Sequence, residues 1–276
     1  MTVLVTGATG TVGREVVRAL LERGAPVRAL TRDPRSTCFD PRVEVVPGDL
    51  TDPGTLGPAS AGVVAAHLIT FTGARGQGGG EPLTEVQPVV DLLVSHGVRR
   101  VTLLHGGGPT PLEDAVRGSS LPWTSLQAVE FMSNALEWAG AVRSGGEVAE
   151  PFVDRLSAMV HESDIGDVAA VALLEPRHEG QSLVVTGPEV LTVRDKVATL
   201  ATALGRPVPL RELSQDEAVR SWREQGHGDD VIGFLLEVYG DTPEAGRTVT
   251  DTVPRVTGHP ARTFASWARD HADAFR

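Results

Sequence analysis

Three glycines near the start of the chain have the spacing of a phosphate-binding turn. Gly7, Gly10 and Gly13 stand between an apolar run, residues 2–6, and a run with helical periodicity, residues 12–23. Glycine lets a turn close tightly, lets backbone approach a ligand and lets a helix pack closely on a strand. The start of the helix adds free N–H groups that suit phosphate oxygens. This pattern predicts a dinucleotide-binding loop made of Gly7, Thr9, Gly10, Thr11, Val12 and Gly13.

The end of the next apolar run indicates which dinucleotide is bound. A site for NAD usually has an acidic residue there, which holds the ribose 2′-hydroxyl. Here the run ends in Thr31 and Arg32. A guanidinium at this point suits the 2′-phosphate of NADP(H), so we expect NADPH as the cofactor. The alternative is a solvated arginine in a turn. Asp49 and Leu50, which follow a third run, are expected near the adenine.

Polar residues at the ends of two later apolar runs are candidates for the reacting end of the cofactor. His105 ends residues 100–105 and could donate a proton, contact the cofactor or substrate, or simply pack. Thr70 follows residues 63–69 and is expected to contact the cofactor. The backbone of Ala128 and Val129, after a sixth run, is expected to hold the nicotinamide carboxamide.

Apolar side chains supply a candidate substrate slot. A flat aromatic substrate would suit Phe71, Phe131, Met132, Trp138 and Phe152, although each of them taken alone is more typical of a core residue. His161 lies near Asp164 but lacks further ligands, so no metal is expected.

The apolar runs alternate with helical ones, which positions these residues. Strands are expected at residues 2–6, 26–31, 43–47, 63–69, 100–105 and 123–126, with helices between them. The alternation predicts an α/β fold with a doubly wound parallel sheet. Residues 1–150 are expected to bind the cofactor, continued by a strand near 182–186, and residues 151–276 mainly the substrate. Helices are expected there, including one at residues 262–275. The glycine-rich residues 73–80 are expected to form either a mobile flap or a surface loop.

Composition excludes several classes of protein. The 276 residues carry a net charge of −11, which disfavours nucleic acid and anionic membranes as partners. No apolar run approaches the ~20 residues that a membrane span needs, and we expect no signal peptide before the first strand. The single cysteine, Cys38, cannot form an internal disulfide. We expect a cytoplasmic protein, either a monomer or a homodimer, that binds a small molecule.

Several segments resemble the NmrA-like branch of the atypical short-chain dehydrogenases/reductases. The resemblance covers nearly the whole chain and is carried by TGATGTVG near the start, GDL at 48–50, WTSLQAVEFMSN at 123–134, DIGDVAAVAL at 164–173, TGPEVLT at 186–192 and residues 249–275. It implies a Rossmann domain with a small, α-rich, mostly C-terminal substrate lobe. Members of this branch include quinone reductases, ketone reductases of actinomycete aromatic polyketide pathways and non-catalytic redox sensors. One departure is Gln127-Ala128, where the family often has Arg-Pro.

The usual catalytic groups of short-chain reductases are missing. Those enzymes protonate the new alkoxide with a Tyr whose pKa is lowered by a Lys four residues later, aided by a Ser. Here the single tyrosine is Tyr239 and the single lysine is Lys196, in the wrong order and far apart. We therefore expect hydride transfer from NADPH to an activated acceptor, a carbonyl or quinone on a polycyclic aromatic polyketide such as an angucycline-type intermediate. The alternatives are an NADP(H)-binding redox sensor that acts through a protein partner, and an isomerase or dehydratase that keeps the cofactor.

Overall fold

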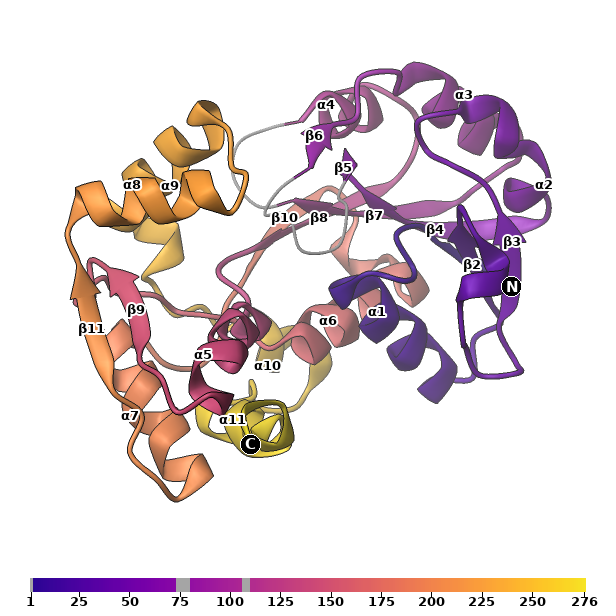
Figure 1. Ribbon diagram of the computed structural model, residues 1–276. Helices are drawn as coiled ribbons and strands as arrows, with labels where there is room; N and C mark the ends of the chain where they lie inside the picture. Colours follow the sequence, from indigo (N-terminus) through magenta and orange to yellow (C-terminus); the bar gives the residue numbers. More distant parts are fainter. Residues whose placement is uncertain (1, 73–79, 106–109) are drawn as a thin grey trace. The chain divides into compact units, whose positions relative to one another are not determined.

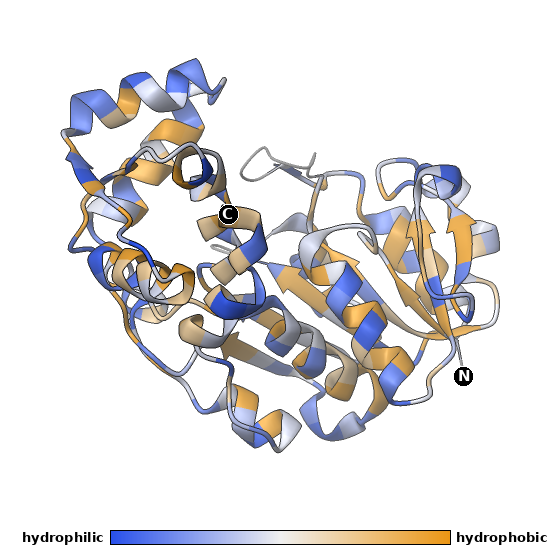
Figure 2. Ribbon diagram, turned by 60° about the horizontal axis from the view of Figure 1, so that its bottom comes forward, coloured by the Kyte–Doolittle hydropathy of each residue, from blue (hydrophilic) through white to orange (hydrophobic). Residues whose placement is uncertain are grey.

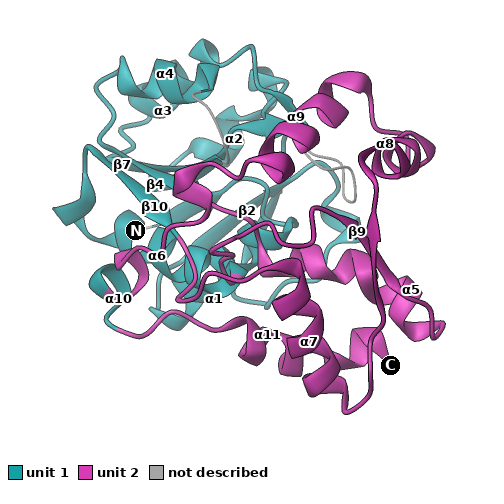
Figure 3. Ribbon diagram, turned by 90° about the vertical axis from the view of Figure 1, so that its left-hand side faces the viewer, with its two compact units in different colours: residues 1–128, 162–185, 255–258 teal, residues 129–161, 186–254, 259–276 magenta. Residues whose placement is uncertain are grey.

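The chain forms two compact units (Figure 3). The computed structural model describes residues 2–72, 80–105 and 110–276. Unit 1 comprises residues 1–128, 162–185 and 255–258, and unit 2 comprises residues 129–161, 186–254 and 259–276. The boundary expected at residue 150 concerns ligand binding and stays a prediction. Most of the glycine-rich loop, residues 73–79, lies outside the described residues.

Unit 1 is built on one parallel sheet, and every pairing in it is parallel. In spatial order the strands are β10 (Gln181–Val185), β8 (Trp123–Ala128), β7 (Arg100–His105), β4 (Val63–Ile69), β1 (Thr2–Val5), β2 (Val27–Thr31) and β3 (Glu44–Pro47) (Figure 1). The order reverses between β1 and β4, which is where doubly wound sheets bind their ligands. The predicted fold class is confirmed.

Helices cover both faces of this sheet (Figure 1). On one face, α1 (Thr11–Glu22) packs on α6 (Glu162–Leu174). The contact is close because α6 has Gly166 there, where a Cβ would lie 2.6 Å from the backbone of Glu15. The other face carries α2 (Gly57–Ser60), α3 (Gln87–Ser95) and α4 (Pro111–Arg117). A short antiparallel ribbon pairs β5 (Phe71–Thr72) with β6 (Glu81–Pro82).

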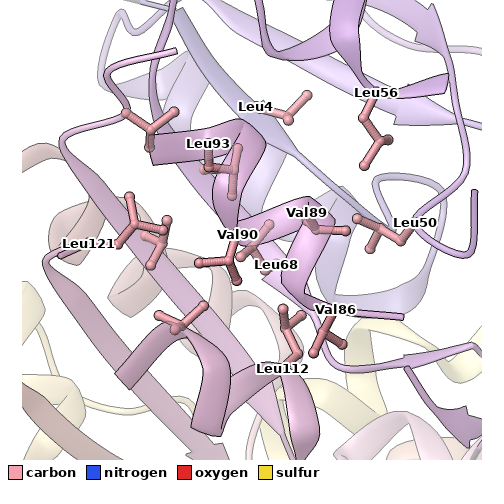
Figure 4. Close-up of a cluster of buried hydrophobic side chains, with 14 of the residues drawn as sticks. Leu4, Leu50, Leu56, Leu68, Val86, Val89, Val90, Leu93, Leu112 and Leu121 are labelled. Atoms are coloured by element: carbon pink, nitrogen blue, oxygen red, sulfur yellow. The ribbon is translucent and has the colours of Figure 1, made fainter. Parts of the chain in front are cut away.

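Apolar side chains from the strands and from α2, α3 and α4 form the main core of unit 1 (Figure 4). Leu4 and Leu68 come from neighbouring strands and pack with Val90 and Leu93 of α3. Figure 2 colours the ribbon by hydropathy. The strands of this sheet are mostly hydrophobic, whereas α1 carries both hydrophobic and hydrophilic residues. The core holds the carboxyl ends of the strands in a fixed arrangement.

Unit 2 has a smaller sheet with helices around it. Its strands β9 (Val148–Pro151) and β11 (Leu210–Leu213) pair in parallel. Its helices are α5 (Ala139–Arg143), α7 (Val193–Leu204), α8 (Gln215–Glu224), α9 (Asp229–Gly240) and α11 (Phe264–Asp270), while α10 (Thr252–Thr257) is divided between the units. The expected helix at 262–275 is shorter than predicted, because Thr263 caps its start and a 3₁₀ turn, Ala272–Phe275, replaces its end. Among the described residues, no helix combines the length and apolar character needed to cross a membrane.

Candidate functional site

The parallel sheet brings the predicted residues of unit 1 to one edge, the one formed by the carboxyl ends of its strands. Because all seven strands run in the same direction, their carboxyl ends share that edge. The glycine loop follows β1, Arg32 follows β2 and Thr70 follows β4, while His105 ends β7 and Ala128 ends β8. The expected nucleotide contacts therefore lie along a single edge. Val129 is the first residue of unit 2.

The glycine loop has the geometry of a phosphate cradle. Gly7 has a φ of +58°, in the left-handed region. The N–H of Gly10 donates to the carbonyl of Gly7 at 2.8 Å. A Cβ on Gly13 would lie 2.1 Å from that same carbonyl oxygen, so no other residue fits there. Gly10 also begins α1 without a side-chain cap, which leaves N–H groups of the first turn for a ligand. These residues fit a dinucleotide pyrophosphate.

The loops after β2 and β3 present different polar groups. Arg32 is exposed. Its acidic neighbour Asp33 instead caps a 3₁₀ turn by accepting the N–H of Arg35 at 3.0 Å, so that carboxylate is engaged by the backbone. Asp49 accepts the N–H and hydroxyl of Thr51, each at 2.9 Å. The next residue, Leu50, is buried in the unit 1 core. The adenosine roles of Arg32, Asp49 and Leu50 stay predictions.

A buried polar cluster surrounds the end of β7. Glu113 of α4 has a side chain only 3% exposed, and its Oε2 lies 3.6 Å from Nε2 of His105. Its other oxygen, Oε1, accepts the hydroxyl of Ser125 at 2.8 Å and the guanidinium of Arg117 at 2.7 Å. Burial opposes ionisation of Glu113, but these hydrogen bonds and the charges of His105 and Arg117 outweigh it and lower its pKa. The carboxylate is thus ionised beside the imidazole.

Two other polar side chains of unit 1, those of Thr70 and His67, form hydrogen bonds within the sheet. The hydroxyl of Thr70 is buried and donates to the carbonyl of Leu104 at 3.0 Å. His67 lies inside β4, fully buried, with Nδ1 2.8 Å from the hydroxyl of Thr102. Burial lowers the pKa of His67 to about 4, so this imidazole is neutral. His67 is a core side chain.

The five residues expected in the substrate slot do not share one environment. Met132 and Trp138 are buried in the unit 2 core, and Trp138 Nε1 donates to Glu150 at 2.8 Å. Phe131 and Phe71 are partly buried, the latter in β5 of unit 1. Phe152 lines a pocket of about 330 Å³ within unit 2 and has a φ of +49°. Their part in substrate binding stays a prediction.

The single lysine and the single tyrosine have separate partners in unit 2. Lys196 is fully buried and donates to Glu130 Oε2 at 2.8 Å. Burial raises the pKa of Glu130, but the charges of Lys196 and Arg155 outweigh it and lower the pKa overall. The guanidinium of Arg155 lies 4.0 Å from the ring centre of Tyr239, whose pKa is raised by burial. Lysine and tyrosine therefore do not form the pair that short-chain reductases use.

Sequence reasoning missed Glu113, because it lies eight positions after His105 and the helix spacing alone indicates a surface carboxylate. Its role depends on where α4 packs against β7 and β8. The only sequence signal was Arg117, four residues later, which fits a helical ion pair.

Comparison with known proteins relates the chain to NAD(P)H-binding reductases. Residues 7–113 match an NAD(P)H-binding family. The chain is 37% identical to a (4-alkanoyl-5-oxo-2,5-dihydrofuran-3-yl)methyl phosphate reductase of Streptomyces griseus, and 35% identical to an NAD(P)H azoreductase of Xenophilus azovorans, over 99% of each chain. An NADPH-dependent quinone oxidoreductase of Escherichia coli, solved with NADPH, shares its fold with a TM-score of 0.77 at 22% identity, covering 97% of this chain and 99% of that one.

Fold, nucleotide loop and relatives together define an NADPH-dependent oxidoreductase. More closely, the chain belongs to the NmrA-like branch of the atypical short-chain dehydrogenases/reductases. The prediction that NADPH is the cofactor is confirmed.

Proposed function

We propose that this oxidoreductase reduces a carbonyl or quinone conjugated with an aromatic system. The observation that carries the proposal is the set of groups found at the carboxyl ends of the strands in unit 1. It has a loop for the dinucleotide and an imidazole beside an ionised carboxylate, while the only lysine and tyrosine of the chain are engaged in unit 2. The bound cofactor supplies the hydride. The residues of the chain supply position and, at His105, a candidate proton.

An activated acceptor suits a site without the tyrosine–lysine pair. A well-placed general acid accelerates proton transfer by roughly 10²–10⁴-fold. A quinone needs less of this help because its reduced oxygens are stabilised by the aromatic ring that forms. A ketone with an ortho or peri phenol can receive its proton from that phenol. Polycyclic aromatic polyketides, angucycline-type intermediates among them, contain both groups.

The named relatives support reduction of small conjugated molecules. One acts on a dihydrofuran with oxo and alkanoyl groups and the other is an azoreductase. We infer that the acceptor of this chain belongs to the same broad class, with electron-withdrawing groups next to the reduced bond.

The test is a panel of acceptors assayed with NADPH. A naphthoquinone and a peri-hydroxy polycyclic ketone are compared with cyclohexanone, which lacks any internal stabilisation. We expect kcat/KM for the activated acceptors to exceed that for cyclohexanone by at least about 100-fold, the lower end of what a general acid contributes. Equal values would contradict the proposal. Tight NADPH binding with no oxidation by any acceptor would instead favour the redox sensor.

A further inference from the structure

The two oxygens of the buried Glu113 carboxylate differ in their hydrogen bonds. Oε1 accepts Ser125 at 2.8 Å and both Nη2 and Nε of Arg117, at 2.7 and 3.2 Å. Arg117 is itself fixed by the hydroxyl of Ser182 at 2.8 Å and by the ring of Trp123 at 4.1 Å. Oε2 is buried and has no hydrogen-bond partner among the described residues. The orientation of the carboxylate is therefore set by its first oxygen.

The group that faces Oε2 is the imidazole of His105. Its Nε2 lies 3.6 Å from Oε2, and its side chain is 8% exposed. Its other nitrogen, Nδ1, is buried without a partner among the described residues. A buried acceptor left unpaired costs free energy, more so when it is charged. A hydrogen on Nε2 removes that cost after a small ring movement, whereas a hydrogen on Nδ1 leaves two lone pairs facing each other.

We propose that Glu113 is a positioning residue that keeps a hydrogen on Nε2 of His105 and so makes Nδ1 the nitrogen that meets the ligand. The arrangement follows a general rule, in which the hydrogen bond made by one ring nitrogen decides the state of the other. The tautomer of His105 can be measured in the protein without any ligand. The part of this tautomer in the reaction rests on the proposed function.

In that reaction the proton moves from Nδ1. The protonated ring gives its Nδ1 hydrogen to the oxygen anion left on the reduced acceptor, so that one N–H bond breaks and one O–H bond forms. The ring becomes neutral, with its remaining hydrogen on Nε2 and shared with Glu113. A proton taken up from solvent then returns the ring to its protonated state. Glu113 itself stays ionised throughout, because Arg117 and Ser125 remain on Oε1.

Replacing Glu113 by glutamine makes a sharp test. Arg117 can only donate, so the amide oxygen of Glu113→Gln must take the place of Oε1, and the amide NH₂ then faces Nε2 of His105. The histidine must accept at Nε2, which moves its hydrogen to Nδ1. A hydrogen bond to a charged group is lost as well, so the ratio of the two tautomers changes by about 10- to 100-fold.

The measurement is a ¹⁵N NMR spectrum of the histidine rings in the full-length protein without cofactor, in mildly alkaline buffer. The His105 signals are assigned by their loss in His105→Asn. We expect Nε2–H in the wild type and Nδ1–H in Glu113→Gln. The matched control is Glu179→Gln, which removes a carboxylate that pairs at 3.1 Å with Arg100 at the start of the same strand, β7. It should leave the His105 signals unchanged.

The outcomes separate this inference from the proposed function. Nδ1–H in the wild type overturns the inference, even if the variant fails to fold. An unchanged tautomer in a folded Glu113→Gln overturns it too. Where a naphthoquinone is reduced, kcat should fall in Glu113→Gln at nearly constant KM. Nε2–H in a wild-type protein that reduces no acceptor would leave the Glu113–His105 arrangement standing and contradict the proposed function alone.

Discussion

At the scale of single residues, position along a strand decides what a histidine of this sheet can do. His67 lies in the middle of β4 and is bonded to Thr102, while His105 ends β7 beside Glu113. Both rings are buried, yet only His105 is at the edge where doubly wound sheets bind ligands. The sequence indicates this difference in position, because residues 63–69 continue past His67 whereas residues 100–105 stop at His105.

The buried His67 makes the stability of the protein depend on pH. Its pKa is about 4 in the folded chain, against 6.5 for the free side chain. Between those values the unfolded chain binds a proton that the folded chain does not, so stability falls as the pH drops from about 6.5 towards 4. The full shift corresponds to about 3 kcal/mol.

Urea unfolding at pH 7.5 and at pH 5 measures this contribution. His67→Gln keeps a hydrogen-bonding group for Thr102 but cannot titrate. We expect the variant to lose less unfolding free energy than the wild type between the two pH values, by about 2 kcal/mol. Equal losses would show that His67 does not carry the effect.

At the scale of elements, the junction of β1 and α1 is the most constrained part of the site. The carbonyl of Gly7 receives the N–H of Gly10 and leaves no room for a Cβ on Gly13. Overpacking of this kind typically costs 1–3 kcal/mol of stability. It also displaces the first turn of α1, whose N–H groups are expected to bind the pyrophosphate.

Gly13→Ala should therefore weaken NADPH binding by more than about tenfold and lower the free energy of unfolding by about 1–3 kcal/mol. Calorimetric titration and urea unfolding give the two values. Gly57→Ala in α2 is the matched control, since a Cβ there meets nothing within 4 Å. An affinity of Gly13→Ala equal to that of the control would contradict the assigned geometry of the loop.

Some elements were predictable from the sequence and others were not. The six expected strands of unit 1 are present, because buried parallel strands read as continuous apolar runs bounded by turns. The strands β9 and β11 were missed, since VAEP and LREL are short and contain charged residues or proline. Glu113 was missed for a related reason: only the packing of α4 on the sheet brings it to His105.

At the scale of the whole molecule, one chain combines two compact units. Unit 1 has the complete sheet and the nucleotide loop, and the NAD(P)H-binding family matches residues 7–113 within it. Unit 2 has its own core, around Trp267, and its own pocket of about 330 Å³. The named relatives match 99% of the chain, so both units belong to the reductase architecture.

The most direct test of the account is a single-turnover reaction. The protein is held in excess over NADPH, a naphthoquinone is added, and the absorbance of the reduced nicotinamide is followed together with the hydroquinone. The account predicts complete loss of NADPH and one hydroquinone formed for each NADPH consumed, at a rate far above that without protein. Bound NADPH that stays reduced in the presence of the quinone would contradict it.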